Sequence, residues 1–438
     1  MLRRRMPSVR INLSSIPDRN DPWASGFLAP VCTLRCDSQT LVSTATVGES
    51  VIRKWTSPLE ALRWMSQTFW PGKGRWIGYL GYDLGRIFER LSCNAVDDLH
   101  LPLFAFTYCR TVSERSYAPE PDYGSREPLS PSSGTPGEGR GGGRNSVGPG
   151  ITPTLALPRS TGGGDKAPLR SNFSREQYLA AVDRVLNYIS AGDVFQVNLA
   201  QRFTAGLTTH PANIYRDLIR QSPALYGAYL GFGDFALISN SPELFLHVTP
   251  DRRIITRPIK GTRPIGPGME EQLRDSIKDQ AELNMIIDLE RNDLGRVCEI
   301  GSVRVTQPRI IESHPTVYHG VATIEGQLRA EIGFVELLAA MFPGGSVTGA
   351  PKIRAMQIID ELEPHRRGPY CGAIGWLDST GEIQFNVAIR TMIAKSGQIH
   401  IPVGGGIVAD SDPMEEYEET LVKAKAMFDA VGISTGMI

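Results

Sequence analysis

Cysteines, long apolar segments and an excess of charge of either sign are all scarce in this sequence of 438 residues. The six cysteines form no CxxC pair, a pattern too sparse for a disulfide scaffold and typical of a reducing compartment. No stretch reaches the roughly 18 apolar residues of a membrane-spanning helix, and no apolar run follows the basic start as in a secretory signal. We therefore expect a cytoplasmic protein without membrane contact.

The balance of charge excludes another class of protein. Lys and Arg total 46 against 47 for Asp and Glu, a net charge of −1, which argues against a strongly basic protein that binds nucleic acid. A small anionic ligand needs only a local positive site and is compatible with this balance. With 41% hydrophobic residues, the chain can build a sizeable core without disulfides or a structural metal.

One segment differs from the rest in composition. The 52 residues from 119 to 170 contain 12 Gly and 9 Pro, and only 9 of them are hydrophobic. Such a segment cannot bury enough apolar surface to offset the entropy lost on ordering. We predict a disordered linker or insertion over 119–171. It would separate a β-rich N-terminal subdomain over 1–118 from a larger unit over 172–438.

The larger unit opens with a recognisable helix and strand. Ser174 and Gln177 form a capping box ahead of an apolar stripe at helical spacing, and Gly192 supplies a stop. The next segment, DVFQVNLAQRF, alternates as a strand does. This alternation would place Phe195 on an apolar face and Gln196 on the opposite, polar face.

Two predicted helices each carry a pair of acidic residues at i,i+3 spacing. Asp279 and Glu282 form the first pair, and Glu416 and Glu419 form the second, with Lys423 one turn later on the same face. Carboxylates that converge from two helices make an oxygen-only site suited to Mg²⁺. Each pair alone also fits a solvated helix face, and Glu419 with Lys423 also fits a simple ion pair. The spacing leaves these alternatives open.

Glycine marks two further segments. FPGGSVTGAPKIRAM runs from a loop into a helix, and it offers backbone N–H groups and the Ser346 hydroxyl to an anion. It lacks the residue order of a Walker A loop. IPVGGGIVADSD follows a strand, and its three glycines fit either a close approach of the backbone to a ligand or a tight turn.

Two single residues suggest covalent and acid–base chemistry. Lys260 lies between apolar and Gly/Pro neighbours in ITRPIKGTRPIG, and a lysine amine that is removed from water can act as a neutral nucleophile. Glu243 follows a proline at a strand start, where it could serve as a general acid or base. A lone lysine is more often a surface residue, so this pattern does not decide the role.

Seven motifs together resemble the chorismate-utilising enzymes, a family that includes anthranilate, aminodeoxychorismate, isochorismate and salicylate synthases. The N-terminal GYLGYDLGR is also similar to the two aminating members of the family. The match is dense over about 172–435. The seven motifs are PIKGT (258–262), SPELF (241–245), AELNMIIDLERNDLGRVC (281–298), FPGGSVTGAPKIRAM (342–356), YCGAIG (370–375), NVAIRT (386–391) and GGGIVADSDP-x-x-EY-x-ET (404–420).

The resemblance implies a Mg²⁺ site and a chorismate site. Glu282 and Glu419 would bind Mg²⁺, with Asp279 and Glu416 in support through water. The ion would hold one chorismate carboxylate and polarise the C4 hydroxyl. The residues implied to bind the other carboxylate are Arg390, Tyr370, Gly404, Gly405, Gly406 and Lys423. The residues implied to line the ring and its hydroxyl are Ser346, Thr262 and His319.

Two positions distinguish members within the family. The water-using members carry a base lysine where this chain has Gln196, which favours an ammonia user. Anthranilate synthases read PIAGT where this chain reads PIKGT, so Lys260 resembles the nucleophile of the aminodeoxychorismate synthases. The implied reaction has Lys260 attack C2 with a proton from Glu243, after which ammonia enters at C4 to give 4-amino-4-deoxychorismate.

The resemblance further implies a fold and a partner. The fold is α+β, with two packed, mainly antiparallel sheets flanked by outer helices. Ammonia would come from a separate glutamine amidotransferase subunit, because the chain shows no nucleophilic-cysteine elbow of that kind. Anthranilate synthesis is the alternative, and a non-catalytic binding subunit would require a broken site. The tryptophan-binding signature of anthranilate synthase is not clear in RINLSSIPDRND.

Overall fold

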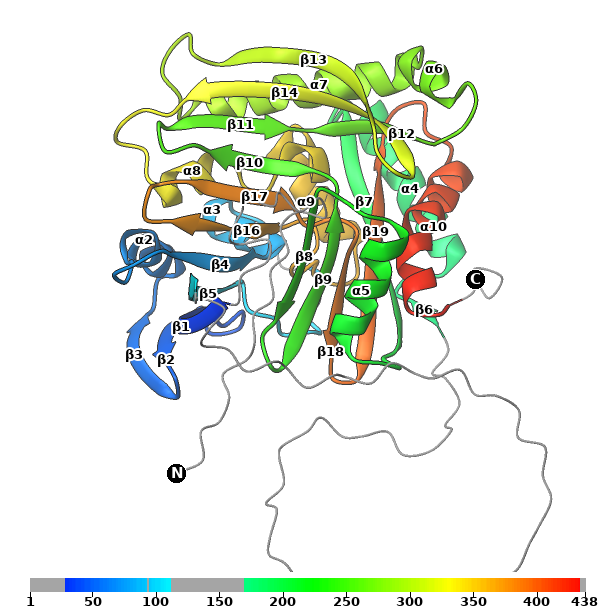
Figure 1. The fold of residues 1–438 in the computed structure, drawn as a ribbon. Helices are drawn as coiled ribbons and strands as arrows, with labels where there is room; N and C mark the ends of the chain where they lie inside the picture. The colour runs from blue at the N-terminus through cyan, green and yellow to red at the C-terminus, as the bar shows by residue number, and fades with distance from the viewer. Residues whose placement is uncertain (1–27, 93, 112–168, 434–438) are drawn as a thin grey trace, which may run out of the picture.

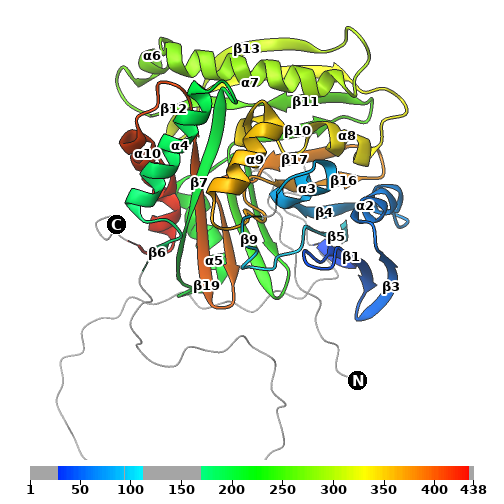
Figure 2. The same ribbon diagram turned by 180° about the vertical axis from the view of Figure 1, so that it is seen from behind.

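Two antiparallel sheets form the framework of the computed structural model, which describes residues 28–92, 94–111 and 169–433 (Figure 1). One sheet has 12 strands and the other has 7. Helices α2, α4, α5, α7 and α10 lie at the outside of the molecule in both views (Figures 1 and 2). The predicted α+β fold is therefore confirmed.

The larger sheet runs in the order β12-β14-β11-β10-β17-β16-β4-β5-β1-β2-β3, and β13 also pairs with β14. Its middle is rich in aromatic residues, which favour a pleated, buried surface. Trp76 and Tyr108, for example, are fully buried neighbours. The strands are β1 Leu28–Cys36, β2 Ser43–Val47, β3 Ser50–Trp55, β4 Gly74–Leu80, β5 Phe104–Thr111, β10 Leu244–Val248, β11 Arg253–Arg257, β12 Ile259–Pro264, β13 Arg304–Ser313, β14 Val317–Gln327, β16 Ala373–Asp378 and β17 Ile383–Val387.

The smaller sheet runs in the order β15-β7-β19-β18-β9-β8, and β6 also pairs with β7. Its centre is the long pair β7 and β19, which stay in register from Val197 opposite Ile407 to Gly206 opposite Gln398. The strands are β6 Arg170–Ser171, β7 Gln196–Gly206, β8 Tyr226–Gly231, β9 Phe235–Ser241, β15 Gly349–Ala350, β18 Thr391–Lys395 and β19 Gln398–Ile407.

The helices pack against these sheets and against each other. Helix α7 contacts β12, β13 and β14, whereas α10 contacts β19, α4 and α5. No helix in the described ranges is long and apolar enough to cross a membrane. The helices are α2 Pro58–Gln67, α3 Gly85–Phe88, α4 Arg175–Ser190, α5 Pro211–Gln221, α6 Met269–Arg274, α7 Ile277–Gly295, α8 Phe334–Met341, α9 Lys352–Leu362 and α10 Pro413–Ala430, with 3₁₀ turns η1 Tyr82–Leu84 and η3 Gly345–Val347.

The N-terminal strands and the later strands share the larger sheet. Strand β16 pairs along its whole length with β4, so the chain before residue 112 and the chain after residue 168 are joined by backbone hydrogen bonds. The division into units over 1–118 and 172–438 stays a prediction. The predicted linker over 119–171 lies almost entirely outside the described residues.

Among the described residues, two of the links that carry the chain from one sheet to the other are short, contain no helix and lie next to each other. The chain crosses through Pro242 and Glu243 between β9 and β10, and through residues 388–390 between β17 and β18. The two crossings are hydrogen-bonded, because Val387 N donates to Glu243 O and Asn240 N donates to Arg390 O, each at 3.0 Å. Glu243 and Arg390 therefore meet at the junction of the sheets.

The first elements of the larger unit test the local predictions. The capping box of Ser174 and Gln177 is present at the start of α4, and Gly192 after its end has a left-handed φ of 81°. Gln196 begins β7 as a buried residue. The placement of Phe195 on an apolar strand face is wrong. It precedes the strand and is 71% exposed, because the packed part of the sheet begins one residue later.

Candidate active site

A cavity opens at the junction of the two sheets. Four of the predicted substrate-binding residues line it, and they come from four separate segments of the chain. They are Thr262, His319, Arg390 and Lys423. The folded chain therefore brings together side chains that are up to 161 positions apart in the sequence, as between Thr262 and Lys423. A concave site with a few convergent polar groups is typical of a small-molecule site.

One wall of the cavity is a pair of neighbouring strands. Thr262 of β12 lies opposite His319 of β14, and the Thr262 hydroxyl is hydrogen-bonded to His319 Nδ1 at 2.9 Å. Burial, with smaller effects from the charges of His314 and Arg390, lowers the pKa of His319 to about 3. His319 is therefore a neutral imidazole at physiological pH.

Lys260 lies two residues before Thr262 on the same strand. Its Nζ donates to Gln196 Oε1 at 3.2 Å and lies 3.4 Å from Glu282 Oε2. The side chain is only 11% exposed. The amine is thus held away from bulk water between a polar amide of β7 and a carboxylate of α7.

The three glycines Gly404–Gly406 lie inside β19, opposite Asn198–Ala200 of β7. The tight-turn alternative is therefore wrong, and the glycines instead allow side chains to approach the strand. A Cβ added to Gly406 would lie 3.1 Å from Lys260 Nζ, and one added to Gly405 would lie 3.1 Å from Glu416 Oε2. Lys423 Nζ donates to Gly404 O at 3.0 Å. This strand therefore lies between Lys260 on one side and the carboxylates of Glu416 and Glu419 on the other.

The four predicted metal-binding carboxylates lie on α7 and α10 as expected, but each faces a positive side chain. Glu282 faces Lys260, and Asp279 pairs with Arg263 at 3.0 Å. Glu419 pairs with Lys423 at 2.5 Å, while Glu416 lies 3.8 Å from Lys278. Among the described residues, no three Asp, Glu, His or Cys side chains are grouped closely enough to hold a metal ion.

The two carboxylates of α10 differ in environment. Burial raises the pKa of Glu416, whereas Lys423 lowers the pKa of Glu419. Glu416 Oε1 accepts from Ser411, but its buried Oε2 has no hydrogen-bond partner among the described residues. A buried carboxylate oxygen without a donor is costly, and it is the kind of atom that a hard cation binds. The donor set therefore fits Mg²⁺ in its chemistry.

Glu243 is a buried carboxyl group at the first crossing. Burial raises its pKa to about 7, and the Ser346 hydroxyl and the Lys260 charge oppose that shift. Its environment therefore keeps much of Glu243 protonated near neutral pH, as a general acid requires. Ser346 itself is buried in η3.

Tyr370 and Arg390 are two further buried groups, and they lie close enough for Tyr370 to affect the pKa of Arg390. Both are in non-strand segments, Tyr370 just before β16 and Arg390 at the second crossing with a left-handed φ of 50°. Burial raises the pKa of Tyr370 well above its usual value and lowers that of Arg390, while Tyr370 and Glu419 oppose the change at Arg390. The guanidinium group stays charged and available to an anion.

Some lining residues were not identified from the sequence. Asn240 and His314 line the cavity, and Lys278 faces Glu416. Asn240 directly precedes the SPELF motif, and His314 stands five residues before His319, so proximity to a motif was the signal available. Lys278 directly precedes Asp279 and was hidden by its position at an exposed helix start.

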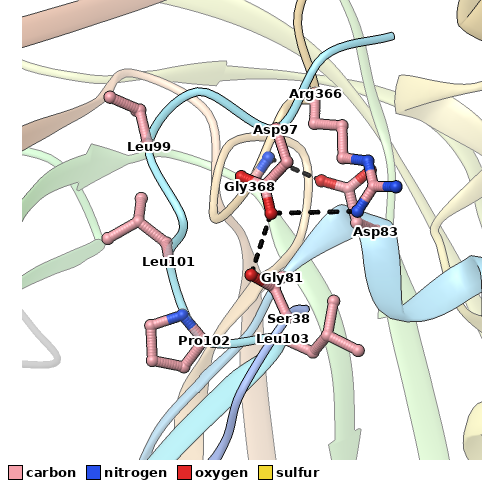
Figure 3. A pocket seen from close by; sticks show the side chains of 10 residues that line it. All are labelled: Ser38, Gly81, Asp83, Asp97, Leu99, Leu101, Pro102, Leu103, Arg366 and Gly368. Atoms are coloured by element: carbon pink, nitrogen blue, oxygen red, sulfur yellow. Dashed lines mark hydrogen bonds and ion pairs between the residues drawn. The ribbon is translucent and has the colours of Figure 1, made fainter. Parts of the chain in front are cut away.

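A second, smaller cavity lies at the N-terminal side of the molecule (Figure 3). Asp97, Arg366 and Asp83 face it, and Asp97 Oδ2 accepts from Ser38 at 2.8 Å. None of the predicted catalytic, substrate-binding or metal-binding residues lines it. It is therefore separate from the candidate active site.

Comparison with known proteins gives a family and two kinds of relative. The family model described as chorismate binding enzyme matches residues 17–429. Anthranilate synthase component 1 of Thermus thermophilus is 42% identical over 385 residues, or 82% of this chain and 78% of the relative. Aminodeoxychorismate synthase component 1 of Bacillus subtilis is 36% identical over 437 residues, or 95% and 90%.

A solved structure agrees with the same grouping. Anthranilate synthase component I from Streptococcus pneumoniae superposes with a TM-score of 0.70 at 28% identity, over 91% of this chain and 90% of that one. Relatives with two different names thus match over most of their length. The comparisons give the family and the fold, and both names remain candidates for the reaction.

Proposed function

The chain belongs to the chorismate binding enzymes, and from this premise we propose that it aminates chorismate with ammonia to 4-amino-4-deoxychorismate through a covalent intermediate on Lys260. The observation that carries the proposal is the position of Lys260 Nζ. It lies in a dry site, 3.4 Å from Glu282 and 3.2 Å from Gln196. An alanine at this position would offer no nucleophile.

Substrate binding is assigned to four residues that line the cavity and to five others that the lining does not include. The lining residues are Thr262, His319, Arg390 and Lys423, and the others are Tyr370, Ser346, Gly404, Gly405 and Gly406. The Arg390 guanidinium, the Tyr370 hydroxyl, the Lys423 ammonium and the backbone of Gly404–Gly406 would bind one carboxylate by charge-assisted hydrogen bonds. Thr262, neutral His319 and Ser346 would line the ring. Because these groups come from separate strands, turns and helix α10, they would together hold C2 of the ring near Lys260 Nζ, where proximity accelerates attack.

The chemical steps then follow from two side chains. The amine of Lys260, once it has lost its proton, attacks C2, the ring double bonds shift, and the C4–O bond breaks. The protonated carboxyl of Glu243 gives its proton to the departing hydroxyl, which leaves as water. Ammonia next attacks C4, the double bonds shift back, and the C2–N bond to Lys260 breaks. The new C4 ammonium returns a proton to the Glu243 carboxylate, so the product carries an amino group at C4 and both the lysine amine and the Glu243 acid are regenerated.

Magnesium is the cofactor that we assign to this reaction. Glu282 of α7 and Glu419 of α10 would hold the ion, with Asp279 and Glu416 in support. The oxygen-only donor set and the unpartnered Glu416 Oε2 support this assignment. When bound, the ion would supply Lewis-acid assistance to departure of the C4 hydroxyl.

Ammonia supply completes the proposal. Relatives that match this chain are named component 1, which supports a separate subunit that would release ammonia from glutamine. We place the reaction in the cytoplasm, consistent with the sparse cysteines of the sequence.

Anthranilate synthesis is the alternative function. The 42% identity to the Thermus thermophilus anthranilate synthase component 1 favours it, whereas Lys260 in PIKGT favours amination at C4. The two products differ in mass, because anthranilate has lost the enolpyruvyl group as pyruvate and 4-amino-4-deoxychorismate has kept it.

Product identification decides between them. The purified chain would be incubated with chorismate, an ammonium salt and Mg²⁺, and the product identified by mass spectrometry and NMR. We expect 4-amino-4-deoxychorismate. Fluorescent anthranilate, formed without any added lyase, would contradict the proposal.

Replacement of Lys260 tests the covalent route. Lys260→Ala should lower the rate of amination by about 100-fold or more, because it removes the nucleophile. The control is Lys425→Ala, which removes an exposed lysine that pairs with Asp429 and should leave the rate unchanged. Wild-type turnover by Lys260→Ala would rule out attack by this amine.

A further inference from the structure

A buried ion pair behind the candidate active site is not used by the proposed chemistry. Arg367 and Glu363 are 3% and 5% exposed, and the guanidinium donates to both oxygens of Glu363, with Nη2 to Oε1 at 2.6 Å and Nε to Oε2 at 3.0 Å. Glu363 Oε1 also accepts from Ala200 N of β7 at 2.9 Å. A buried ion pair is weak evidence for stability, because desolvation offsets most of its attraction.

The same guanidinium also holds two separate backbone segments of the site. Arg367 Nη1 donates to Val347 O at 2.9 Å, and Nη2 donates to Asn198 O at 2.6 Å. Val347 directly follows Ser346, which lies near enough to Glu243 to lower the pKa of that carboxyl, although its hydroxyl makes no hydrogen bond among the described residues. Asn198 lies opposite Gly406 in β7, two residues after Gln196. One side chain therefore ties the Ser346 turn to the strand that carries the lysine contact.

The N-terminal GYDLGR segment holds the loop that carries Arg367. Asp83 Oδ2 accepts from Gly368 N at 2.8 Å (Figure 3), and Tyr82 N donates to Gly368 O at 2.7 Å. The Arg367 guanidinium also lies 4.6 Å from the centre of the Tyr82 ring. The N–H and C=O groups of Gly368 are thus both hydrogen-bonded to the N-terminal segment, and the Tyr82 ring contacts the guanidinium. These contacts restrict the movement of Arg367.

We propose that Arg367 is a positioning residue for the chorismate reaction. By donating to the carbonyls of both Val347 and Asn198, it holds the segment of Ser346 in place relative to the strand of Gln196. Glu243 and Lys260, which lie next to these two segments, are thereby kept in alignment. The planar fork of arginine can serve two carbonyls and a carboxylate at once, whereas the single ammonium of lysine cannot do so in this geometry. The inference rests on the proposed function only in requiring that chorismate is consumed.

The decisive variant removes the ion pair without leaving a buried charge. In the double variant Glu363→Gln/Arg367→Met, the glutamine Oε1 can still accept from Ala200 N, and methionine fills much of the arginine volume. We expect the melting temperature to change by less than about 6 °C. We expect kcat for loss of chorismate to fall about 10- to 100-fold, because the reacting groups lose alignment. The KM for chorismate should change less than about 3-fold, because Arg390 and Lys423, the two charged side chains assigned to the carboxylate, are on other segments.

A conservative variant and a matched control complete the test. Arg367→Lys keeps a positive charge beside Glu363 and should fold. Its kcat should nevertheless be as low as that of the double variant. The control Arg354→Met/Asp193→Asn removes an ion pair that is 36% and 39% exposed, and it should leave kcat unchanged. All rates are measured well below the melting temperature, as loss of chorismate whatever the product.

Each outcome decides the inference. Wild-type kcat in the folded double variant, or in Arg367→Lys, would overturn the positioning role. If both variants fail to fold, the pair is a stability element and the inference is wrong. Failure of the proposed function would look different, because the wild-type chain would then leave chorismate unchanged or give another product.

Discussion

At the scale of single residues, burial sets the charge state of the groups that line the candidate site. Glu243 and His319 are both buried, and the effect on each pKa disfavours the charged form. The carboxyl group is therefore partly protonated near pH 7, and the imidazole is neutral. Neither state can be read from the residue type, since exposed glutamate is ionised at this pH.

This charge state predicts a pH dependence of the rate. Glu243 has a pKa of about 7 in the folded protein, so the proton that it donates is present below pH 7 and is lost above it. At constant free NH₃, kcat/KM for chorismate should therefore fall as pH rises through about 7. Glu243→Gln should lower kcat by about 100-fold or more and remove this descending limb.

A second buried carboxyl group provides the control for this profile. Glu290 accepts from the Thr256 hydroxyl at 2.8 Å, and burial raises its pKa to about 8. Glu290→Gln should keep the limb near pH 7. If that variant loses the limb, or if the wild-type rate continues to rise through pH 8, the acid role of Glu243 is wrong.

At the scale of elements, the glycine segment of β19 makes the site compact. Gly405 and Gly406 have neighbours that would lie within 3.1 Å of an added Cβ, namely Glu416 Oε2 and Lys260 Nζ. A strand with side chains here would displace both. Because these glycines have no side chains, residues of both α10 and β12 can approach the same short stretch of the β19 backbone.

A methyl group added to this strand should act on the lysine directly. Gly406→Ala places its Cβ 3.1 Å from Lys260 Nζ, so the amine must shift by a few tenths of an ångström. We expect kcat to fall about 10-fold or more with the melting temperature nearly unchanged, measured by turnover and calorimetry. Gly295→Ala, where an added Cβ meets nothing within 4 Å, should have wild-type kcat. Equal rates for the two variants would contradict the close approach.

At the scale of the whole molecule, the two crossings between the sheets create the site. Glu243 stands on one crossing and Arg390 on the other, and hydrogen bonds between the crossings join them. The N-terminal strands extend the same large sheet through β4 and β16. The site is thus built by the entire framework and not by one local motif.

The cysteines of the described chain bear on the source of ammonia. Cys32, Cys36, Cys109, Cys298 and Cys371 are all buried. Burial raises the pKa of each thiol, to about 11 for Cys36 and Cys298 and about 12 for the other three. A glutaminase nucleophile needs an accessible thiolate, which none of these five provides.

The donor of nitrogen follows as a prediction. The purified chain should consume chorismate with ammonium salts but not with glutamine alone, and a glutamine amidotransferase subunit should restore turnover with glutamine. Loss of chorismate is measured in each case, with the glutamine stock first freed of ammonia. Turnover by the chain with pure glutamine would contradict the need for a second subunit.

The sequence by itself determined the local features and the family. The capping box of α4 and the helical spacing of Glu282, Glu416 and Glu419 depend on contacts within a few residues, so a short pattern is enough to predict them. The ordered motifs likewise predicted the two-sheet fold and the match to chorismate binding enzymes. They gave Lys260 as a candidate nucleophile, but not its surroundings.

The tertiary structure decided which of these side chains meet. Lys260 contacts residues that are 64 and 22 positions away in the sequence. The three glycines lie within strand β19 and not in a turn. Arg367 donates to carbonyls that are 20 and 169 positions away. Such contacts depend on the register of β7 with β19 and on where the chain changes sheet. Register and crossing points arise from the packing of whole faces, and no short stretch of sequence encodes them.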